Sequence, residues 1–138
     1  MPPVPRLAPE GLAFVDIETT GGPAQRESIT EIAIVQVDED GVREWSSLVR
    51  PALRIPDYIR RLTGIDDAMV ADAPRFAEIA DEVYDRLDGR LFVAHNARFD
   101  HGHLRAAFRR AGLDIRPQVL CTVKLSRRLF PDHRRFFF

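Results

Sequence analysis

Hydrophobic and polar residues near the N-terminus alternate in a way typical of a β-strand. The segment 14–21 reads Phe-Val-Asp-Ile-Glu-Thr-Thr-Gly. Successive side chains of a strand point to opposite faces, so Asp16 and Glu18 share one face while Val15 and Ile17 share the other. The pattern therefore predicts two carboxylates held close together on one side of a sheet.

Two further strands are predicted directly downstream. Residues 29–37 alternate and are rich in β-branched side chains, and residues 42–49 form another strand-like segment. The sequence Asp-Glu-Asp-Gly at 38–41 is a turn signal between them. Together with the first strand, these segments predict an antiparallel three-strand meander.

The middle of the chain shows helical spacing. Residues 56–62 predict a short helix that ends at Thr63 and Gly64, since glycine is the usual residue just past a helix end. In residues 74–87, apolar side chains recur at three- and four-residue steps with acids on the opposite side. This second helix is predicted to pack its apolar face on the core.

A strand-to-helix junction is predicted next. Residues 90–94 are an apolar run typical of a short buried strand, and the residues that follow have helical spacing. One stripe of that helix contains Asp100, Leu104, Ala107, Phe108 and Ala111. Asp100 thus lies near the helix start, where a carboxylate can also act only as a cap. Gly112 ends the helix, and residues 119–122 predict a last strand.

The acid pair on the first strand indicates a cation site. An ionised carboxylate removed from water costs several kcal/mol unless it is paired or binds a metal, and this strand carries no Lys or Arg. Carboxylate oxygens suit a hard ion such as Mg²⁺ or Mn²⁺. The alternative is an exposed edge strand whose acids simply meet solvent.

Length and composition add bounds to this picture. The 138 residues suit one domain, with residues 1–10 as a flexible N-terminal lead-in and residues 11–138 as the folded part. No signal-peptide core and no transmembrane run are evident, so we expect a cytoplasmic protein without a membrane partner. Cys121 is the single cysteine and is predicted to be a packed thiol.

The net charge of −1 hides an uneven distribution of charge. Acids crowd residues 66–88, while cations dominate the C-terminal part. These cations are Arg98, Arg105, Arg109, Arg110, Arg116, Lys124, Arg127, Arg128, Arg134 and Arg135. A local basic surface can hold phosphates even on a neutral chain. The alternative is ordinary solvated helix faces, which we favour for Arg105, Arg109 and Arg110.

Two motifs resemble a known enzyme family. The sequences F-V-D-I-E-T-T-G and H-N-A-R-F-D, about eighty residues apart, are similar to the first two motifs of the DEDD superfamily of 3′→5′ exonucleases. The likeness is closest to the branch that includes the proofreading epsilon subunit of bacterial DNA polymerase III. It implies an α/β, ribonuclease H-like fold, in which a mixed sheet of the meander plus parallel strands has flanking helices.

The resemblance also implies an activity and its partners. The expected reaction is metal-dependent hydrolysis of terminal phosphodiesters of DNA, in replication proofreading or repair. The expected ligands are a single-stranded DNA 3′ end, with RNA as an option, and a DNA polymerase subunit. Its cofactor would be Mg²⁺ or Mn²⁺, two ions in the full family site.

Site residues follow from the same resemblance. The catalytic and metal-binding carboxylates would be Asp16, Glu18 and Asp100. The residues implied to bind substrate are Thr19, Thr20, Thr63, Ile65, His95, Asn96 and Phe99. For Phe99, core packing is an equal alternative.

One departure from the family pattern limits these expectations. The third family motif carries a general-base His and, five residues later, a metal-binding Asp, yet His133 is followed at that spacing by Phe138. We therefore expect a domain that lacks its C-terminal helix, binds one ion and cuts weakly, and whose Leu129 and Phe130 are exposed along with residues 136–138. The alternative is a catalytically silent nucleic-acid or polymerase-binding module. His101, His103 and His133 are expected at the surface.

Overall fold

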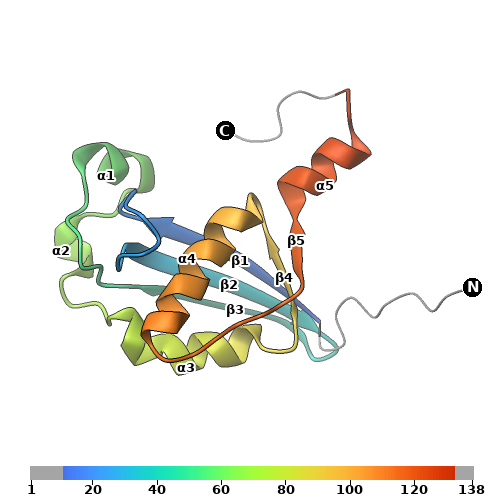
Figure 1. Cartoon of the computed structure of the whole chain (residues 1–138), viewed down its shortest axis with the longest axis horizontal. Helices are drawn as coiled ribbons and strands as arrows, with labels where there is room; N and C mark the ends of the chain where they lie inside the picture. The colour runs from blue at the N-terminus through green and yellow to red at the C-terminus, as the bar shows by residue number, and fades with distance from the viewer. Residues whose placement is uncertain (1–10, 133–138) are drawn as a thin grey trace, which may run out of the picture.

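The computed structural model describes residues 11–132, which form a five-stranded mixed sheet in the order β3-β2-β1-β4-β5 (Figure 1). The strands are β1 (Leu12–Thr19), β2 (Ile29–Asp38), β3 (Gly41–Leu48), β4 (Leu91–Ala94) and β5 (Val119–Cys121). The first three pair antiparallel, whereas β4 pairs parallel with β1 and β5 parallel with β4. The predicted meander and α/β class are confirmed, and the predicted lead-in over residues 1–10 lies outside the described residues.

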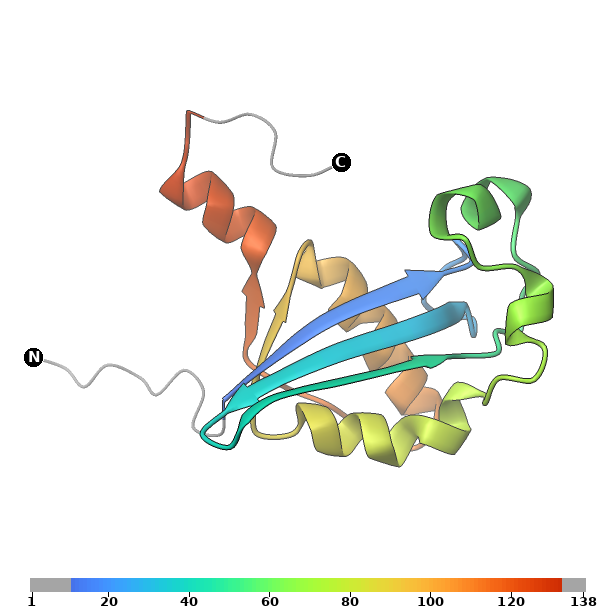
Figure 2. The same cartoon turned by 180° about the vertical axis from the view of Figure 1, so that it is seen from behind.

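The alternation of β1 divides its residues between two environments. Val15 and Ile17 are buried in the core, whereas Phe14 and Asp16 are exposed on the opposite face. Two long helices, α3 (Phe76–Leu87) and α4 (Ala97–Arg110), cover the core face. Seen from behind, the strands face the viewer and α4 lies beyond them (Figure 2). Asp16 therefore lies on the face of the sheet that α3 and α4 leave open.

The helices are fixed to the sheet by apolar side chains at helical spacing. Phe108 of α4 meets Phe76 of α3 edge to face, with ring centroids 5.1 Å apart, and Tyr84 approaches the same ring at 6.0 Å. Such geometry is the preferred one for aromatic pairs. The predicted stripe of the second long helix is confirmed, because Leu104, Ala107 and Phe108 are all buried.

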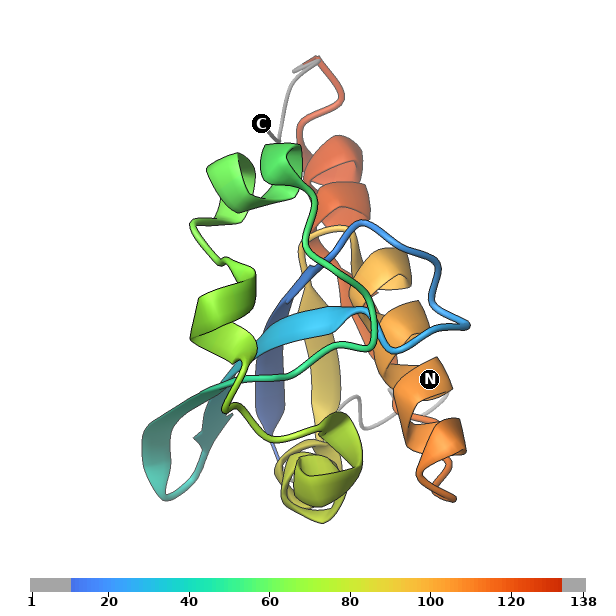
Figure 3. The same ribbon diagram turned by 90° about the vertical axis from the view of Figure 1, so that its left-hand side faces the viewer.

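A smaller apolar cluster lies beyond the end of β1. It joins α1 (Asp57–Thr63) and α2 (Asp67–Val70) through Ile55, Ile59, Ile65 and Val70. Gly64 ends α1 in the left-handed conformation, at φ 77°, as predicted. The sequence pattern missed α2, which is one turn long and is capped by the Asp66 carboxylate at the Met69 N–H. Both helices lie toward the viewer in Figure 3.

The last described helix, α5 (Thr122–Leu129), was not predicted. Thr122, expected at the end of the last strand, begins this helix instead. The helix continues from β5 and stands away from the sheet (Figures 1 and 2). Val123 is its one buried residue, while Leu129 and Phe130 are 61% and 54% exposed. The predicted exposure of those two is confirmed, and residues 136–138 lie outside the described part.

Over residues 11–132, no helix combines the length and the apolar character that crossing a bilayer requires.

Candidate active site

The fold brings three acids from two distant segments together. Asp16 and Glu18 lie on β1, and Asp100 lies in the first turn of α4, directly after β4. Because β4 runs parallel to β1, the start of α4 lies beside the end of β1. The Ile17 N–H donates to Asp100 Oδ1 at 3.0 Å, between the two β1 acids. This bond holds the Asp100 carboxylate against β1.

A strained residue makes the turn from β4 into α4. Asn96 has φ 67° and ψ 56°, and it is the one non-glycine residue with positive φ among residues 11–132. This left-handed conformation costs about 1–2 kcal/mol for a residue with a Cβ. Its carbonyl accepts from the Phe99 N–H at 3.0 Å. Strain retained at such a junction is typical of functional sites.

Two of the three acids, Asp100 and Glu18, have raised pKa values. Burial is the main cause that raises the pKa of Asp100 to about 7, and the charges of Asp16 and Glu18 add to it against the Ile17 N–H bond. Burial also raises the pKa of Glu18, with the charges of Asp16 and Glu31 adding to the effect. Within the described residues, no ion pair reaches Asp16, Glu18 or Asp100. The cluster therefore lacks the positive charge that its acids require.

The oxygen ligands of these acids suit a hard divalent cation, but their side chains are not arranged around a common point. Between residues 11 and 132, no three His, Cys, Asp or Glu side chains are arranged as a ready-made metal site. Asp100 is 4% exposed and already accepts one hydrogen bond, whereas Asp16 is exposed and Glu18 partly so. An all-oxygen donor set with uncompensated charge suits Mg²⁺ or Mn²⁺. Closing the shell would require the Asp16 and Glu18 side chains to turn toward Asp100.

A hollow of about 270 Å³ adjoins Asp16 on the open face of the sheet. Phe14 and Val35 contribute apolar walls, and His95 and Thr122 close the far side. The exposed His95 holds its Nδ1 2.8 Å from the Thr122 Oγ1. The start of α5 is therefore part of the surroundings of the acid cluster.

Four of the predicted substrate residues lie around the end of β1. Thr19 and Thr20 are buried, and their hydroxyls accept from the Gly21 and Gly22 N–H groups. Thr63 donates its hydroxyl to the Ile59 carbonyl and accepts from the Ile65 N–H. Ile65 is 4% exposed and packs in the small cluster. These side chains fix the backbone at this end of the sheet.

The other three predicted substrate residues lie at the start of α4. His95 and Asn96 are exposed, and the Phe99 ring is 43% exposed. One side of the Phe99 ring meets His103, with ring centroids 4.6 Å apart. Phe99 therefore leaves part of its ring available to a ligand.

The expected surface position of His103 is wrong. His103 is buried at 7% exposure, with Nδ1 3.3 Å from the Ser28 Oγ. Burial, and after it the Arg110 charge, lower its pKa. Position 103 lies three residues after Asp100 on the buried stripe, so the helical spacing indicated that His103 is buried. His101 is partly buried against Phe92, and His133 lies outside the described residues.

The sheet order and the flanking helices define a ribonuclease H-like α/β protein, in which three acids meet where β1 ends and α4 begins. The chain belongs to the Exonuclease (RNase_T) family, whose profile matches residues 13–136. This finding confirms the predicted superfamily and its fold. The nearer likeness to the polymerase epsilon subunit stays a prediction.

Known relatives agree with this family. The chain is 38% identical over 126 residues to the 3′-5′ exonuclease DinG of Staphylococcus haemolyticus, over 90% of this chain and 14% of that protein. It is 33% identical to the solved structure of Exonuclease X in complex with 5′ overhanging duplex DNA, with a TM-score of 0.70 over 89% of this chain and 66% of the other. The chain thus spans about one seventh of the length of DinG.

A more distant structure shares the fold. Escherichia coli Exonuclease I, solved in complex with a 5cy-dA13 oligonucleotide, is 18% identical, with a TM-score of 0.75 over 89% of this chain and 31% of the other. The likeness covers most of this chain and concerns the fold alone.

Proposed function

We propose that this chain is a divalent-metal-dependent 3′→5′ exonuclease domain that hydrolyses terminal phosphodiesters of DNA. The observation that carries the proposal is the buried, cation-free Asp100, held on β1 between Asp16 and Glu18. A cluster with perturbed pKa values and no structural partner is a candidate for function. The Exonuclease family and the DinG likeness support the reaction class.

Each acid has a proposed role. Asp16, the most exposed of the three, would hold the cation where the substrate phosphate can reach it, and Glu18 and Asp100 would supply further oxygen ligands. The Ile17 N–H fixes Oδ1 of the Asp100 carboxylate against β1. Bound Mg²⁺ or Mn²⁺ would supply a water of lowered pKa and neutralise charge on the reacting phosphate.

The terminal nucleotide is proposed to lie between the end of β1 and the start of α4. The open part of the Phe99 ring supplies a stacking surface, worth about 1–3 kcal/mol per base. His95 and Asn96 would line the phosphate, while the Thr19, Thr20 and Thr63 hydrogen bonds and the packed Ile65 hold the opposite wall in place. An unpaired 3′ end fits this arrangement better than a duplex end.

The proposal extends to rate and setting. Five residues after His133 stands Phe138 and not the metal-binding Asp of the third motif, so we expect slow hydrolysis by this chain. General-base catalysis typically contributes about 10²–10⁴-fold. The same proposal places this activity in replication proofreading or repair in the cytoplasm. It names a polymerase subunit as partner and RNA ends as a second substrate.

The test is stepwise shortening of 5′-labelled single-stranded DNA in Mn²⁺, resolved on a sequencing gel. We expect a ladder that begins at the 3′ end, stops with a 3′-phosphate, and is lost in Asp16→Ala. Asp40→Ala, which removes an exposed acid of the β2–β3 turn, is the matched control and should cut as the wild type does. Binding of DNA without any ladder would instead support the catalytically silent module.

A further inference from the structure

A second hollow lies between the start of α4, β5 and α5, on the far side of the His95–Thr122 contact from Asp16. Its volume is about 480 Å³. The apolar floor comes from Val119, Leu120 and Leu125. The cations on its walls are Arg98, Lys124 and Arg128, with His101 beside them, and no acid among residues 11–132 lines it. We call this hollow the α4–α5 groove.

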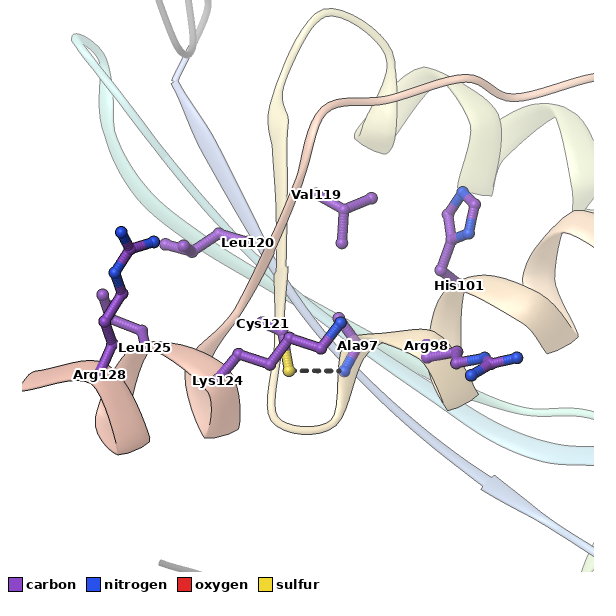
Figure 4. A pocket seen from close by; sticks show the side chains of 9 residues that line it. All are labelled: Ala97, Arg98, His101, Val119, Leu120, Cys121, Lys124, Leu125 and Arg128. Carbon is purple, nitrogen blue, oxygen red and sulfur yellow. Dashed lines mark hydrogen bonds between the residues drawn. The ribbon is translucent and has the colours of Figure 1, made fainter. Parts of the chain in front are cut away.

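Figure 4 shows how these cations are arranged along the groove. Arg98 lies at the α4 end and Arg128 at the α5 end, with Lys124 between them. The Lys124 side chain extends from α5 toward Ala97. Cations spaced in this way face a linear polyanion more naturally than a single small ion.

The groove cations lack the acidic partners that other cations of this chain have. Arg43, Arg75 and Arg86, for example, each pair with a carboxylate at 2.7–3.3 Å. Among residues 11–132, Arg98, Lys124 and Arg128 make no such pair. In a chain with one more acid than base, this local excess of positive charge is available to a ligand.

The backbone of the groove adds further positive potential. Cys121 lies at the base, where its Sγ accepts from the Ala97 N–H at 3.4 Å. The N–H groups of Asn96, Val123 and Lys124 also face this sulfur. Two helix starts therefore direct N–H groups into the same hollow.

The groove lies next to the proposed active site. His95 and Thr122 wall the hollow beside Asp16, while their near neighbours Ala97 and Cys121 line the groove. One hydrogen-bonded pair, His95 with Thr122, thus separates the two. A strand with its 3′ end at Asp16 can pass over this pair into the groove.

We propose that the α4–α5 groove binds the phosphodiester backbone of single-stranded DNA a few nucleotides upstream of the 3′ end. This inference rests on the proposed function for the identity of the strand. Lys124 and Arg128 contact successive phosphates, and the apolar floor takes the intervening sugar or base. Phosphate contacts of this kind position a strand without reading its sequence.

The first test measures how salt weakens the binding of labelled oligo(dT) of about ten nucleotides to the full chain in EDTA. For single strands, each phosphate contact contributes about 0.7 to the slope of log K against log salt. We expect Lys124→Gln and Arg128→Gln each to lower the slope by about that amount. Arg109→Gln, at the exposed far end of α4, is the matched control and should leave the slope unchanged.

The second test uses Cys121, the single cysteine, as a reporter inside the groove. The rate of its modification by a thiol reagent is measured with and without oligo(dT). At ten times its Kd, the longer strand should slow modification about 10-fold by mass action, whereas a strand of about two nucleotides should give no protection.

Two results would overturn the groove proposal. One is a salt slope that falls equally in Arg109→Gln, and the other is a Cys121 rate that the longer strand leaves unchanged. Both measurements run without metal, so they are independent of cleavage. If the chain cleaves DNA but oligo(dT) does not protect Cys121, the groove proposal is wrong and the exonuclease proposal stands. If oligo(dT) protects Cys121 but the chain cleaves no DNA, the exonuclease proposal is wrong and the groove proposal stands.

Discussion

Asp38 and Asp100 are two carboxylates at opposite ends of the sheet, and their surroundings differ in charge. Asp38, at the β2–β3 turn, lies 2.7 Å from Arg43 and 3.3 Å from Arg90, and accepts from the Asp40 N–H at 2.9 Å. Desolvation works to raise its pKa, but these donors outweigh it and lower the pKa. Asp100 has backbone N–H donors but no cation beside it; burial and the charges of Asp16 and Glu18 outweigh those donors and raise its pKa to about 7.

This difference in charged neighbours distinguishes Asp38, which stabilises the fold, from Asp100, which we assign to metal binding and catalysis. A carboxylate with two guanidinium partners favours the folded state in its charged form. A buried carboxylate among other acids opposes folding when charged, and such a cost is typical of functional sites. The contrast yields predictions in which the same substitution acts in opposite ways at the two positions.

The largest expected effect is on catalysis. Asp100→Asn keeps an oxygen for the Ile17 N–H but removes the charge that holds the cation, so kcat/KM should fall on the order of 10³-fold. Asp38→Asn should leave kcat/KM unchanged, because Asp38 lies at the end of β2 that is far from the acid cluster. The measurement is mononucleotide release from single-stranded DNA in Mn²⁺. An equal fall of kcat/KM in the two variants would contradict the assignment of Asp100, and not Asp38, to catalysis.

The second effect is on stability without metal. Because the folded-state pKa of Asp100 exceeds its unfolded value of 3.8, its charged form opposes folding. The penalty grows as pH rises from about 3.8 to about 7 and is fully present above that. One pKa unit corresponds to about 1.4 kcal/mol, and solvent screens part of the repulsion. Asp100→Asn should therefore raise the free energy of unfolding by about 2 kcal/mol near pH 8.

The control for this stability effect is the same measurement at a lower pH. Near pH 5, Asp100 is protonated in the folded chain, and the gain of Asp100→Asn over the wild type should shrink. Urea unfolding in EDTA, followed by circular dichroism at both pH values, measures the difference. A variant less stable than the wild type near pH 8 would show that Asp100 is a structural acid after all.

Asp38→Asn should act with the opposite sign and a smaller size. Its lowered pKa means that the charged form stabilises the fold above pH 3.8, and that this contribution is lost as pH falls through the folded-state pKa. The variant should therefore unfold at a lower temperature near neutral pH. It should match the wild type in strong acid, which thermal unfolding across a pH series would reveal.

The smallest expected effect concerns His103. Its pKa is lowered mainly by burial, so the unfolded chain takes up a proton below pH 6.5 before the folded chain does, and stability falls as pH drops through that range. His103→Phe should remove this acid sensitivity, at a cost of about 1 kcal/mol for the Ser28 hydroxyl left unpaired. An unchanged pH profile would assign the sensitivity to another group.

The sequence predicted the elements that bury a regular face. The alternation of β1 placed Asp16 and Glu18, and the apolar run of β4 followed by the Asp100 stripe placed the third acid. Both signals are strong because one face of each element enters the core. The acid cluster could therefore be anticipated before its geometry was seen.

The missed features lack such a signal. The helix α5 buries only Val123, so no core-facing stripe distinguished it from an extension of the apolar residues in β5. The left-handed Asn96 and the unpaired Lys124 and Arg128 depend on tertiary placement, which local spacing does not encode. The α4–α5 groove thus became visible only in the folded chain.

The most direct test of the central claim is the change in thermal stability on adding Mn²⁺. A cation that binds only the folded chain stabilises it by RT ln(1 + [L]/Kd), about 1.4 kcal/mol at ten times Kd, or about 5 °C for a domain of this size. The wild type and Asp38→Asn should both show this rise, while Asp16→Asn and Asp100→Asn should show none. An equal rise in all four proteins would place the cation elsewhere and contradict the assignment of this acid cluster as the metal site.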